Sequence, residues 1–261
     1  MAADGPGGRD PQRTLELLWG AAAPGSRGPR PSLTLARIVD TAVGVADADG
    51  LPAVSMRKVA DELGVTTMSL YRYVPSKDVL LELMLDAATG VPPDQQMPPE
   101  SWRPAMERWA RAIKARYRER PWMLHVTIAG PPMGPNNLAW MDAGLAPLQD
   151  TGLSPEDMLY VLLLLFVYVR GQAQLGFGMT EAAERTGIPA RERDEVYAQM
   201  MQVLVSSGRY PALAQIAASG VFELADDDPE ADFEFGLSRI LDGVEVLVQV
   251  RRAEGSPTLA R

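Results

Sequence analysis

The sequence predicts an all-α protein in which a small N-terminal three-helix domain with a helix-turn-helix is joined to a larger α-helical domain. Two short amphipathic segments separated by a tight turn occupy residues 54–77, and elsewhere apolar residues recur at helical spacing. No segment shows the strict alternation of a half-buried strand. A proline-rich break at 91–99, VPPDQQMPP, separates the two parts.

The composition indicates a globular protein without thiol chemistry. With 261 residues and 46% apolar content, the chain has room for one small and one larger core. The absence of cysteine excludes disulfides, thiolate metal sites and cysteine nucleophiles. A cytoplasmic protein is expected because no basic and apolar stretch opens the sequence. No membrane contact is expected, because the longest apolar run, 158–169, is shorter than the ~20 residues of a membrane span. We expect that run to be a buried helix.

Four segments are expected along the chain. They are a flexible N-terminal arm with a short helix (1–31), the helix-turn-helix domain (32–76), the larger helical domain (77–252) and a C-terminal tail (253–261). In the arm, Arg27 and Arg30 either reach a minor groove or belong to a disordered tail. Helices are expected at 11–20, 33–48, 77–89, 101–119, 121–129, 136–149, 155–178, 189–207, 210–218 and 229–252.

The helix-turn-helix follows from local residue choices. The apolar residues expected to meet between its two helices are Val59, Leu63, Val65 and Leu70. Gly64 marks the turn, where a positive φ is expected and costs glycine little. Thr66 or Thr67 is expected to cap the second helix, 67–73. Because so short a helix is unstable alone, one side of it must pack on the domain, which leaves the other side free.

The free side of that second helix has the composition of a nucleic-acid contact surface. It combines hydroxyls, aromatic rings and a guanidinium without a carboxylate: Thr67, Met68, Ser69, Tyr71, Arg72 and Tyr73. Basic residues outnumber acidic ones between 55 and 77, although the whole chain carries a net charge of −9. The local charge favours DNA. A solvated helical hairpin without a DNA role is the alternative.

Residues 33–88 resemble the DNA-binding domain of the tetracycline-repressor (TetR) family. The matching segments are LTLARIVDTAVGVADADG, SMRKVADEL and GVTTMSLYRYVPSKDVLLELM. The resemblance implies that Arg57 and Thr67 reach base edges. It also implies phosphate-backbone contacts for Met56, Ser69, Tyr71 and Lys77, and a contact near the backbone or an adjacent base for Tyr73. Since the family often has a hydroxyl where Met56 stands, that contact is expected only through the backbone N–H.

The same resemblance implies that the larger domain binds a ligand and dimerises. Aromatic residues concentrate between 102 and 177, as in a pocket for a drug-sized molecule. The expected ligand-binding residues are Trp109, Tyr117, Trp122, His125, Trp140, Phe166, Arg170, Gln174 and Phe177. Arg170 is the best single polar candidate, because a polar group inside a bundle either pairs internally or orients a ligand. For each aromatic residue, a place in the ordinary core is the alternative.

A dimer interface is expected on the last helix. Its apolar stripe has helical spacing and includes Phe233, Leu237, Leu241, Val244, Leu247 and Val248. With the apolar helix at 158–169, this stripe would form a four-helix interface between two copies, which paired reading heads require. The alternative is that the stripe belongs to the core of one chain.

No catalytic site, metal or cofactor is expected. His125 is the sole histidine, which excludes a multi-histidine metal site. The acidic run at 226–228 is interpreted as a helix N-terminus, where carboxylates are favoured by the helix dipole. No phosphate-cradling glycine motif or paired metal-ligand spacing is present, so an enzyme is not expected.

The expected function is a ligand-responsive transcriptional repressor. It would bind a palindromic, inverted-repeat operator in double-stranded DNA as a homodimer, and a small hydrophobic or drug-like effector would release it. The alternative is a DNA-binding regulator with no small-molecule ligand, either constitutive or controlled by a protein partner.

Overall fold

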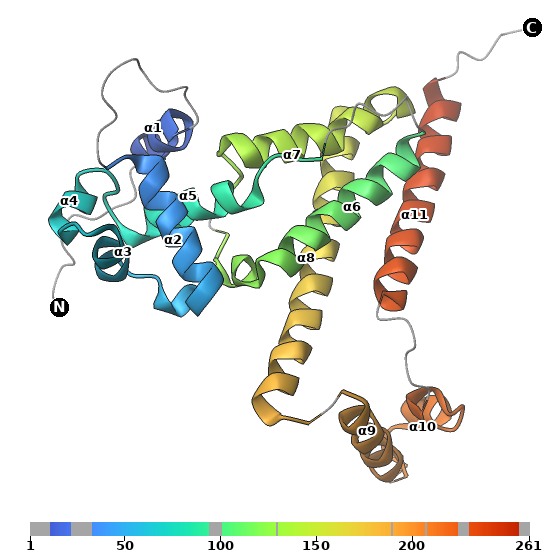
Figure 1. The fold of residues 1–261 in the computed structure, drawn as a ribbon. Helices are drawn as coiled ribbons and strands as arrows, with labels where there is room; N and C mark the ends of the chain where they lie inside the picture. The colour runs from blue at the N-terminus through green and yellow to red at the C-terminus, as the bar shows by residue number, and fades with distance from the viewer. Residues whose placement is uncertain are drawn as a thin grey trace, which may run out of the picture.

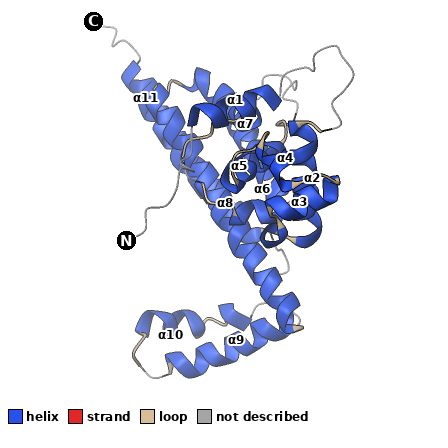
Figure 2. Cartoon of the chain, turned by 90° about the vertical axis from the view of Figure 1, so that its left-hand side faces the viewer, coloured by secondary structure: helices blue, strands red, loops and turns tan. Residues whose placement is uncertain are grey.

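The computed structural model describes residues 11–21, 33–93, 101–128, 130–188, 190–206, 208–223 and 230–255. Every regular element in this described part of the chain is a helix (Figure 2), which confirms the all-α prediction. The arm arginines Arg27 and Arg30, the acidic run at 226–228 and residues 256–261 of the tail lie outside the described residues.

The α-helices are α1 (Pro11–Ala21), α2 (Leu35–Asp49), α3 (Met56–Leu63), α4 (Thr67–Tyr71), α5 (Lys77–Thr89), α6 (Trp102–Glu119), α7 (Pro135–Leu145), α8 (Pro155–Thr186), α9 (Ala190–Val205), α10 (Pro211–Ala217) and α11 (Ala231–Gly255). The described residues also form four short 3₁₀ segments: η1 (Leu51–Ala53), η2 (Pro121–His125), η3 (Ala146–Thr151) and η4 (Val221–Glu223).

The N-terminal unit consists of α2, α3 and α4, and α5 joins it to the rest of the chain (Figure 1). Ile38, Val59 and Leu70 are fully buried where the helices meet. Each of the helices α2 to α5 begins after a hydroxyl residue that accepts a hydrogen bond from the backbone N–H three residues later: Thr34, Ser55, Thr66 and Ser76. These caps define locally where each helix begins.

The larger domain is built on the pairing of α6 with α8, to which α7 and α11 are added (Figure 1). Its core contains Met106, Leu165, Leu237 and Leu241, all with 1% or less of their surface exposed. The helices α9 and α10 pack mainly on each other beyond the far end of α8. The apolar centre of the domain therefore lies close to α5 and far from α9.

Two differences from the predicted helices have physical reasons. Residues 146–151 form a 3₁₀ segment where an α-helix was predicted through 149, because Pro147 has no N–H to continue the ladder of α7. α8 continues past its predicted end at 178, since glycine weakens a helix interior without ending it. The helix ends instead at Gly187, which has a φ of +67°. Residues 121–125 also form a 3₁₀ turn in place of the predicted α-helix.

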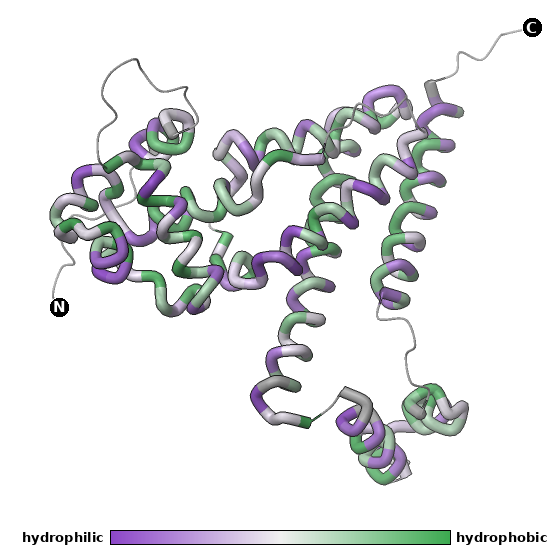
Figure 3. Tube along the Cα trace, in the orientation of Figure 1, coloured by the Kyte–Doolittle hydropathy of each residue, from purple (hydrophilic) through white to green (hydrophobic). Residues whose placement is uncertain are grey.

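The prediction that 158–169 is a buried helix is wrong for one face of α8. Leu165 and Val169 are fully buried, whereas Leu164 and Val167 are 50% and 59% exposed. The residues of α8 in this segment are apolar on every side of the helix (Figure 3). By length and composition alone, residues 155–183 could cross a membrane, a test that core helices of soluble proteins also pass. One chain therefore leaves an apolar face of α8 uncovered.

Candidate nucleic-acid interface and effector region

The turn of the helix-turn-helix is fixed by backbone hydrogen bonds. Gly64 ends α3 in the left-handed conformation (φ +68°, ψ +31°), as predicted, and its N–H donates to the carbonyls of Ala60 and Asp61. The N–H of Val65 also donates to Ala60, at 3.0 Å. Thr66 then caps α4 through its side chain, which accepts from the N–H of Ser69. The recognition helix α4 is thus held at a defined angle to α3.

The outer side of α4 is free of packing. Met68 is 73% exposed and Tyr71 46%, while Leu70 on the opposite side is fully buried. Thr67 and Ser69 are half-buried, and the Ser69 hydroxyl lies 3.0 Å from that of Thr66. The sequence predicted this division between a packed and a free side.

The remaining predicted DNA-contact residues flank α4. Arg57 and Lys77 are exposed, and Tyr73 is half-buried against the core. Met56 is only 7% exposed, so its side chain belongs to the core, and its backbone N–H at the start of α3 is the group left for a phosphate. Arg72, which the resemblance left without a role, is exposed as well.

Acidic neighbours hold two basic side chains of α3. Lys58 pairs with Glu62 at 2.8 Å, and the hydrogen bond that Lys58 donates to the Glu62 carboxylate raises the pKa of Lys58 above its ordinary value. Arg57 lies 3.8 Å from Asp61, but its side chain is 88% exposed. Such an exposed pair is weak, so Arg57 can leave Asp61 for DNA at small cost.

Three of the predicted ligand-binding tryptophans are buried and hydrogen-bonded inside the chain. The indole N–H of Trp109 donates to the carbonyl of Trp140 at 2.9 Å, and that of Trp140 donates to the carbonyl of Gly90 at 2.9 Å. The indole of Trp122 donates to Asp47 at 2.6 Å. Their polar groups are therefore occupied by structural partners, as in the core alternative.

Arg170 likewise has partners within its own chain. Its guanidinium donates to the carbonyls of Leu124 and Val126, at 2.9 and 3.1 Å. It also faces the ring of Tyr117, and burial raises the pKa of that phenol. Arg170 therefore anchors the segment η2 to α8.

Three more of the predicted ligand residues lie on η2 and α8. His125 is exposed and meets the ring of Phe177 edge to face, with ring centroids 5.5 Å apart. Phe166 and Phe177 are half-buried on α8. The structure therefore brings His125 of η2 next to Phe177 of α8, a contact that the sequence did not predict.

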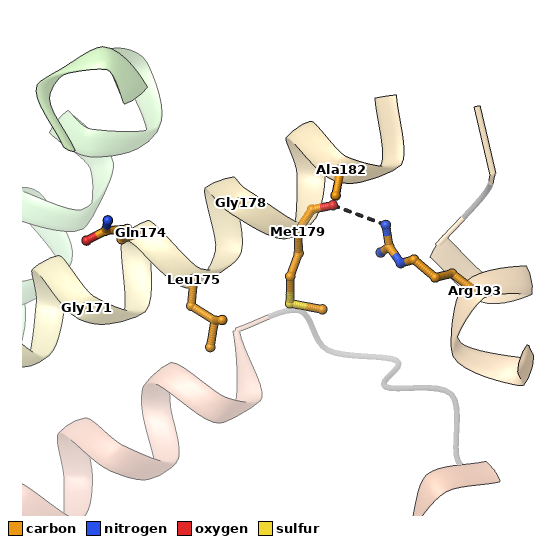
Figure 4. A pocket seen from close by; sticks show the side chains of 7 residues that line it. All are labelled: Gly171, Gln174, Leu175, Gly178, Met179, Ala182 and Arg193. Atoms are coloured by element: carbon orange, nitrogen blue, oxygen red, sulfur yellow. Dashed lines mark hydrogen bonds between the residues drawn. The ribbon is translucent and has the colours of Figure 1, made fainter. Parts of the chain in front are cut away.

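A pocket of about 580 Å³ lies along the C-terminal half of α8 (Figure 4). Its lining consists of Gly171, Gln174, Leu175, Gly178, Met179 and Ala182 from α8 and Arg193 from α9. The Arg193 guanidinium donates to the carbonyl of Met179 at 3.1 Å across the pocket. Of the predicted ligand residues, Gln174 lines this pocket. The lining also includes Gly171 and Gly178, which the sequence did not single out.

For the stripe on α11 that was predicted to form the dimer interface, burial in the single chain favours the core alternative. Five of its residues are at most 5% exposed in the single chain: Phe233, Leu237, Leu241, Val244 and Val248. Leu247 is half-buried against the same core. These side chains belong to the core of their own chain, in which α11 packs on α8.

The described residues contain no group of three histidine, cysteine, aspartate or glutamate side chains placed to hold a metal ion. The acidic run predicted to be a helix N-terminus lies outside those residues.

Comparison with known proteins places both parts of the chain in one family. Residues 38–84 match the family described as bacterial regulatory proteins, tetR family, and residues 94–248 match the tetracyclin repressor-like C-terminal domain. The chain is 42% identical to the HTH-type transcriptional repressor DrrR1 of Streptomyces coeruleorubidus, over 96% of this chain and 92% of that protein.

Solved structures show the same fold. Apo ActR from Streptomyces coelicolor is 27% identical, with a TM-score of 0.67 over 85% of this chain and 99% of that one. ActR in complex with actinorhodin is 28% identical, with a TM-score of 0.65 over 87% of this chain and 99% of that one. With the family models covering most of the chain and the helix-turn-helix geometry in place, the chain belongs to the tetR family of bacterial helix-turn-helix transcriptional repressors.

Proposed function

We propose that this repressor is a cytoplasmic homodimer that binds an inverted-repeat operator in double-stranded DNA and releases it when a small, largely apolar effector binds. The observation that supports operator binding best is the free outer side of α4, which presents Met68 and Tyr71 while Leu70 anchors the helix. Paired helix-turn-helix units read half-sites whose centres lie one DNA turn, about 34–36 Å, or a multiple of it apart. Two copies of the chain are therefore needed.

The exposed face of α8 is the surface proposed for dimerisation. Tyr160, Leu164 and Val167 are 61%, 50% and 59% exposed and follow one another at helical spacing. The outer side of α11 adds Val246 and Val250, which are 60% and 45% exposed. Exposed apolar side chains in a row along one helix face suit a second copy, which would place α8 and α11 of both chains in a four-helix contact.

The effector is proposed to bind between the C-terminal half of α8 and the neighbouring α9. The pocket there is lined mainly by apolar groups, with Gln174 and Arg193 as polar groups that would orient a ligand. Gly171 lies on the proposed dimer face one turn after Val167, so a second copy would close the open side. Support for a ligand also comes from the solved complex of the similar ActR with actinorhodin.

A randomised duplex library, selected by the purified protein and sequenced, tests DNA binding. The expected result is an inverted repeat bound by two copies, as measured by the mass of the complex. No enrichment at low salt would overturn operator binding, and enrichment of an unpaired site would overturn the dimer.

Actinorhodin is the first probe for effector release, used on the selected duplex. The expected result is loss of DNA binding together with a rise in the melting temperature of the protein. If a panel of aromatic and aliphatic compounds that includes actinorhodin changes neither quantity, the regulator is constitutive or controlled by a protein partner.

A further inference from the structure

One buried carboxylate lies between the DNA-binding unit and the larger domain. Asp86, on the last turns of α5, is 6% exposed and is the one buried charged side chain among the described residues. Burying a carboxylate without hydrogen bonds is costly, so its partners must compensate for the water that it loses. Those partners all belong to the N-terminal end of α7.

Two successive asparagines supply the hydrogen bonds. Asn137 donates to Asp86 from its backbone N–H at 2.9 Å and from its side chain at 2.7 Å. Asn136 donates in the same way, at 3.4 Å from the backbone and 3.1 Å from the side chain. The Asn136 side chain also donates to the backbone carbonyl of Asp86 at 3.1 Å. The carboxylate thus caps α7 from another helix, where the helix dipole favours a negative charge.

The backbone around this contact is built for a close approach. A Cβ on Gly134 would lie 2.1 Å from a carboxylate oxygen of Asp86, so a larger residue there would displace α5 from α7. Next to it, the carbonyl of Met133 accepts a hydrogen bond at 3.1 Å from the indole of Trp19 on α1. Since α1 also packs on α2 and α5, the segment before α7 is held both by α5 and by α1.

This contact lies on the shortest covalent route between α4 and the larger domain. α4 ends at Tyr71 and α5 begins at Lys77, and the intervening turn is fixed because the N–H groups of Tyr73 and Val74 donate to the carbonyl of Leu70. α4 and α5 therefore move together. At its other end, α5 is attached to α7 through Asp86 and again at Gly90, which accepts the indole hydrogen bond of Trp140.

We propose that Asp86 is the positioning residue that sets the angle of α5 against α7, and through it the separation of the two recognition helices in the dimer. This proposal rests on the proposed dimeric function and specifies how its two domains are coupled. The carboxylate is required because its two oxygens accept four hydrogen bonds, two on each. An asparagine would direct its own NH₂ group at one pair of these donors and leave them unpaired.

The first test measures the spacing that the protein tolerates between half-sites. Wild type, Asp86→Asn and the milder Asn137→Ala are each bound to duplexes that carry the selected half-sites with spacers of different lengths. The expected result for both variants is an unchanged half-site sequence, an affinity for the best spacing lowered about tenfold, and a broader range of accepted spacings. Asp157→Asn is the matched control, because Asp157 is a hydrogen-bonded carboxylate at the start of α8 that makes no contact between the two domains.

A second test does not depend on DNA. Because the chain has no cysteine, Met68→Cys on α4 and Gln249→Cys on α11 can carry a pair of spin labels, with labelled chains diluted in unlabelled ones so that each dimer holds one labelled copy. The distance distribution is expected to be at least about twice as broad in the Asp86→Asn and Asn137→Ala backgrounds as in the wild type.

The two readouts separate the possible failures. Variants that are folded by circular dichroism and keep both the spacing preference and the label distribution of the wild type would overturn the role of Asp86. If Asp86→Asn does not fold, the same comparison with Asn137→Ala decides. If wild type selects no paired site while the label distribution broadens as expected, the proposed operator binding fails and the positioning role stands.

Discussion

The helix-turn-helix unit and the α8–α11 side of the larger domain differ in where their apolar side chains go. In the unit, Ile38, Val59 and Leu70 are fully buried within one chain, and the exposed side of α4 carries polar residues together with Met68. On α8, by contrast, Leu164 and Val167 remain exposed beside the fully buried Leu165. The unit buries its apolar side chains within one chain, whereas α8 of the larger domain leaves part of its apolar surface exposed.

This difference shows which part of the molecule depends on a second copy. Local caps and a short turn suffice to define the unit, because each helix begins at its own hydroxyl residue. The larger domain has one apolar face that packs on its own chain and one that does not. Folding and association are therefore separable there, and charges placed on the two faces should have different effects.

The largest effect is expected on the inner face. Leu241→Arg would place an unpaired charge among fully buried side chains and should destabilise the larger domain by on the order of 4 kcal/mol. Circular dichroism and thermal melting should show loss of the native transition. If the variant is instead a folded monomer, the apolar stripe of α11 forms the dimer interface.

A smaller effect is expected from the same substitution on the outer face. Leu164→Arg changes a residue that is 50% exposed in one chain, so folding should survive and the dimer should not. Loss of the second reading head should lower operator affinity about 100-fold or more. Light scattering measures the mass, and Leu15→Arg, on the exposed side of α1, is the control that should remain dimeric.

These two substitutions also mark the limit of sequence reasoning. Gly64 and the Thr66 cap were predicted correctly, because a turn and a cap depend on residues a few positions apart. For the stripe containing Leu241 the sequence left both a dimer interface and an intrachain core open, since helical spacing identifies an apolar face without identifying what covers it. On α8 the pattern fails more completely, because leucine occupies both the buried position 165 and the exposed position 164.

The site shows the same limit. Trp109 and Trp140 were plausible ligand residues until their indoles were seen to donate to backbone carbonyls. Long-range contacts of this kind leave no local signal in the sequence. Gly171 and Gly178 gave none either, since a glycine in a helix indicates a hollow only once its neighbours in space are known.

An intermediate effect is expected on the polar face of the unit. Tyr71→Phe and Lys77→Ala each remove one proposed phosphate contact, so each should lower the affinity for all DNA sequences alike, by about tenfold or less. Lys77→Ala should also reduce the slope of log affinity against log salt concentration by about one. Arg57→Ala should instead relax base preference. Tyr210→Phe is the matched control, because that exposed tyrosine precedes α10 and lies outside both the unit and the proposed dimer face. Wild-type affinity for Tyr71→Phe and Lys77→Ala at equal salt would contradict the phosphate contacts.

The smallest effect is a dependence of stability on pH, and the pKa shifts behind it have opposite directions in the two regions. On the larger domain, hydrogen bonds from Lys114 and Arg111 lower the pKa values of Glu230 and Glu234, which hold the start of α11 against α6. A carboxyl whose pKa is lower in the folded state stabilises the protein above its unfolded pKa of about 4.5, and this contribution disappears as the pH falls through the lowered value.

The melting temperature should therefore decline between about pH 5 and 3, and Glu230→Gln with Glu234→Gln should flatten that decline. Because both carboxylates are about two-fifths exposed, each pair should contribute less than about 1 kcal/mol. In the helix-turn-helix unit the shift has the opposite sign, since Glu62 raises the pKa of Lys58 and that contribution is lost only as the pH rises above about 10. An acid decline that the double variant leaves unchanged would mean that carboxylates elsewhere, outside the contact of α11 with α6, control acid stability.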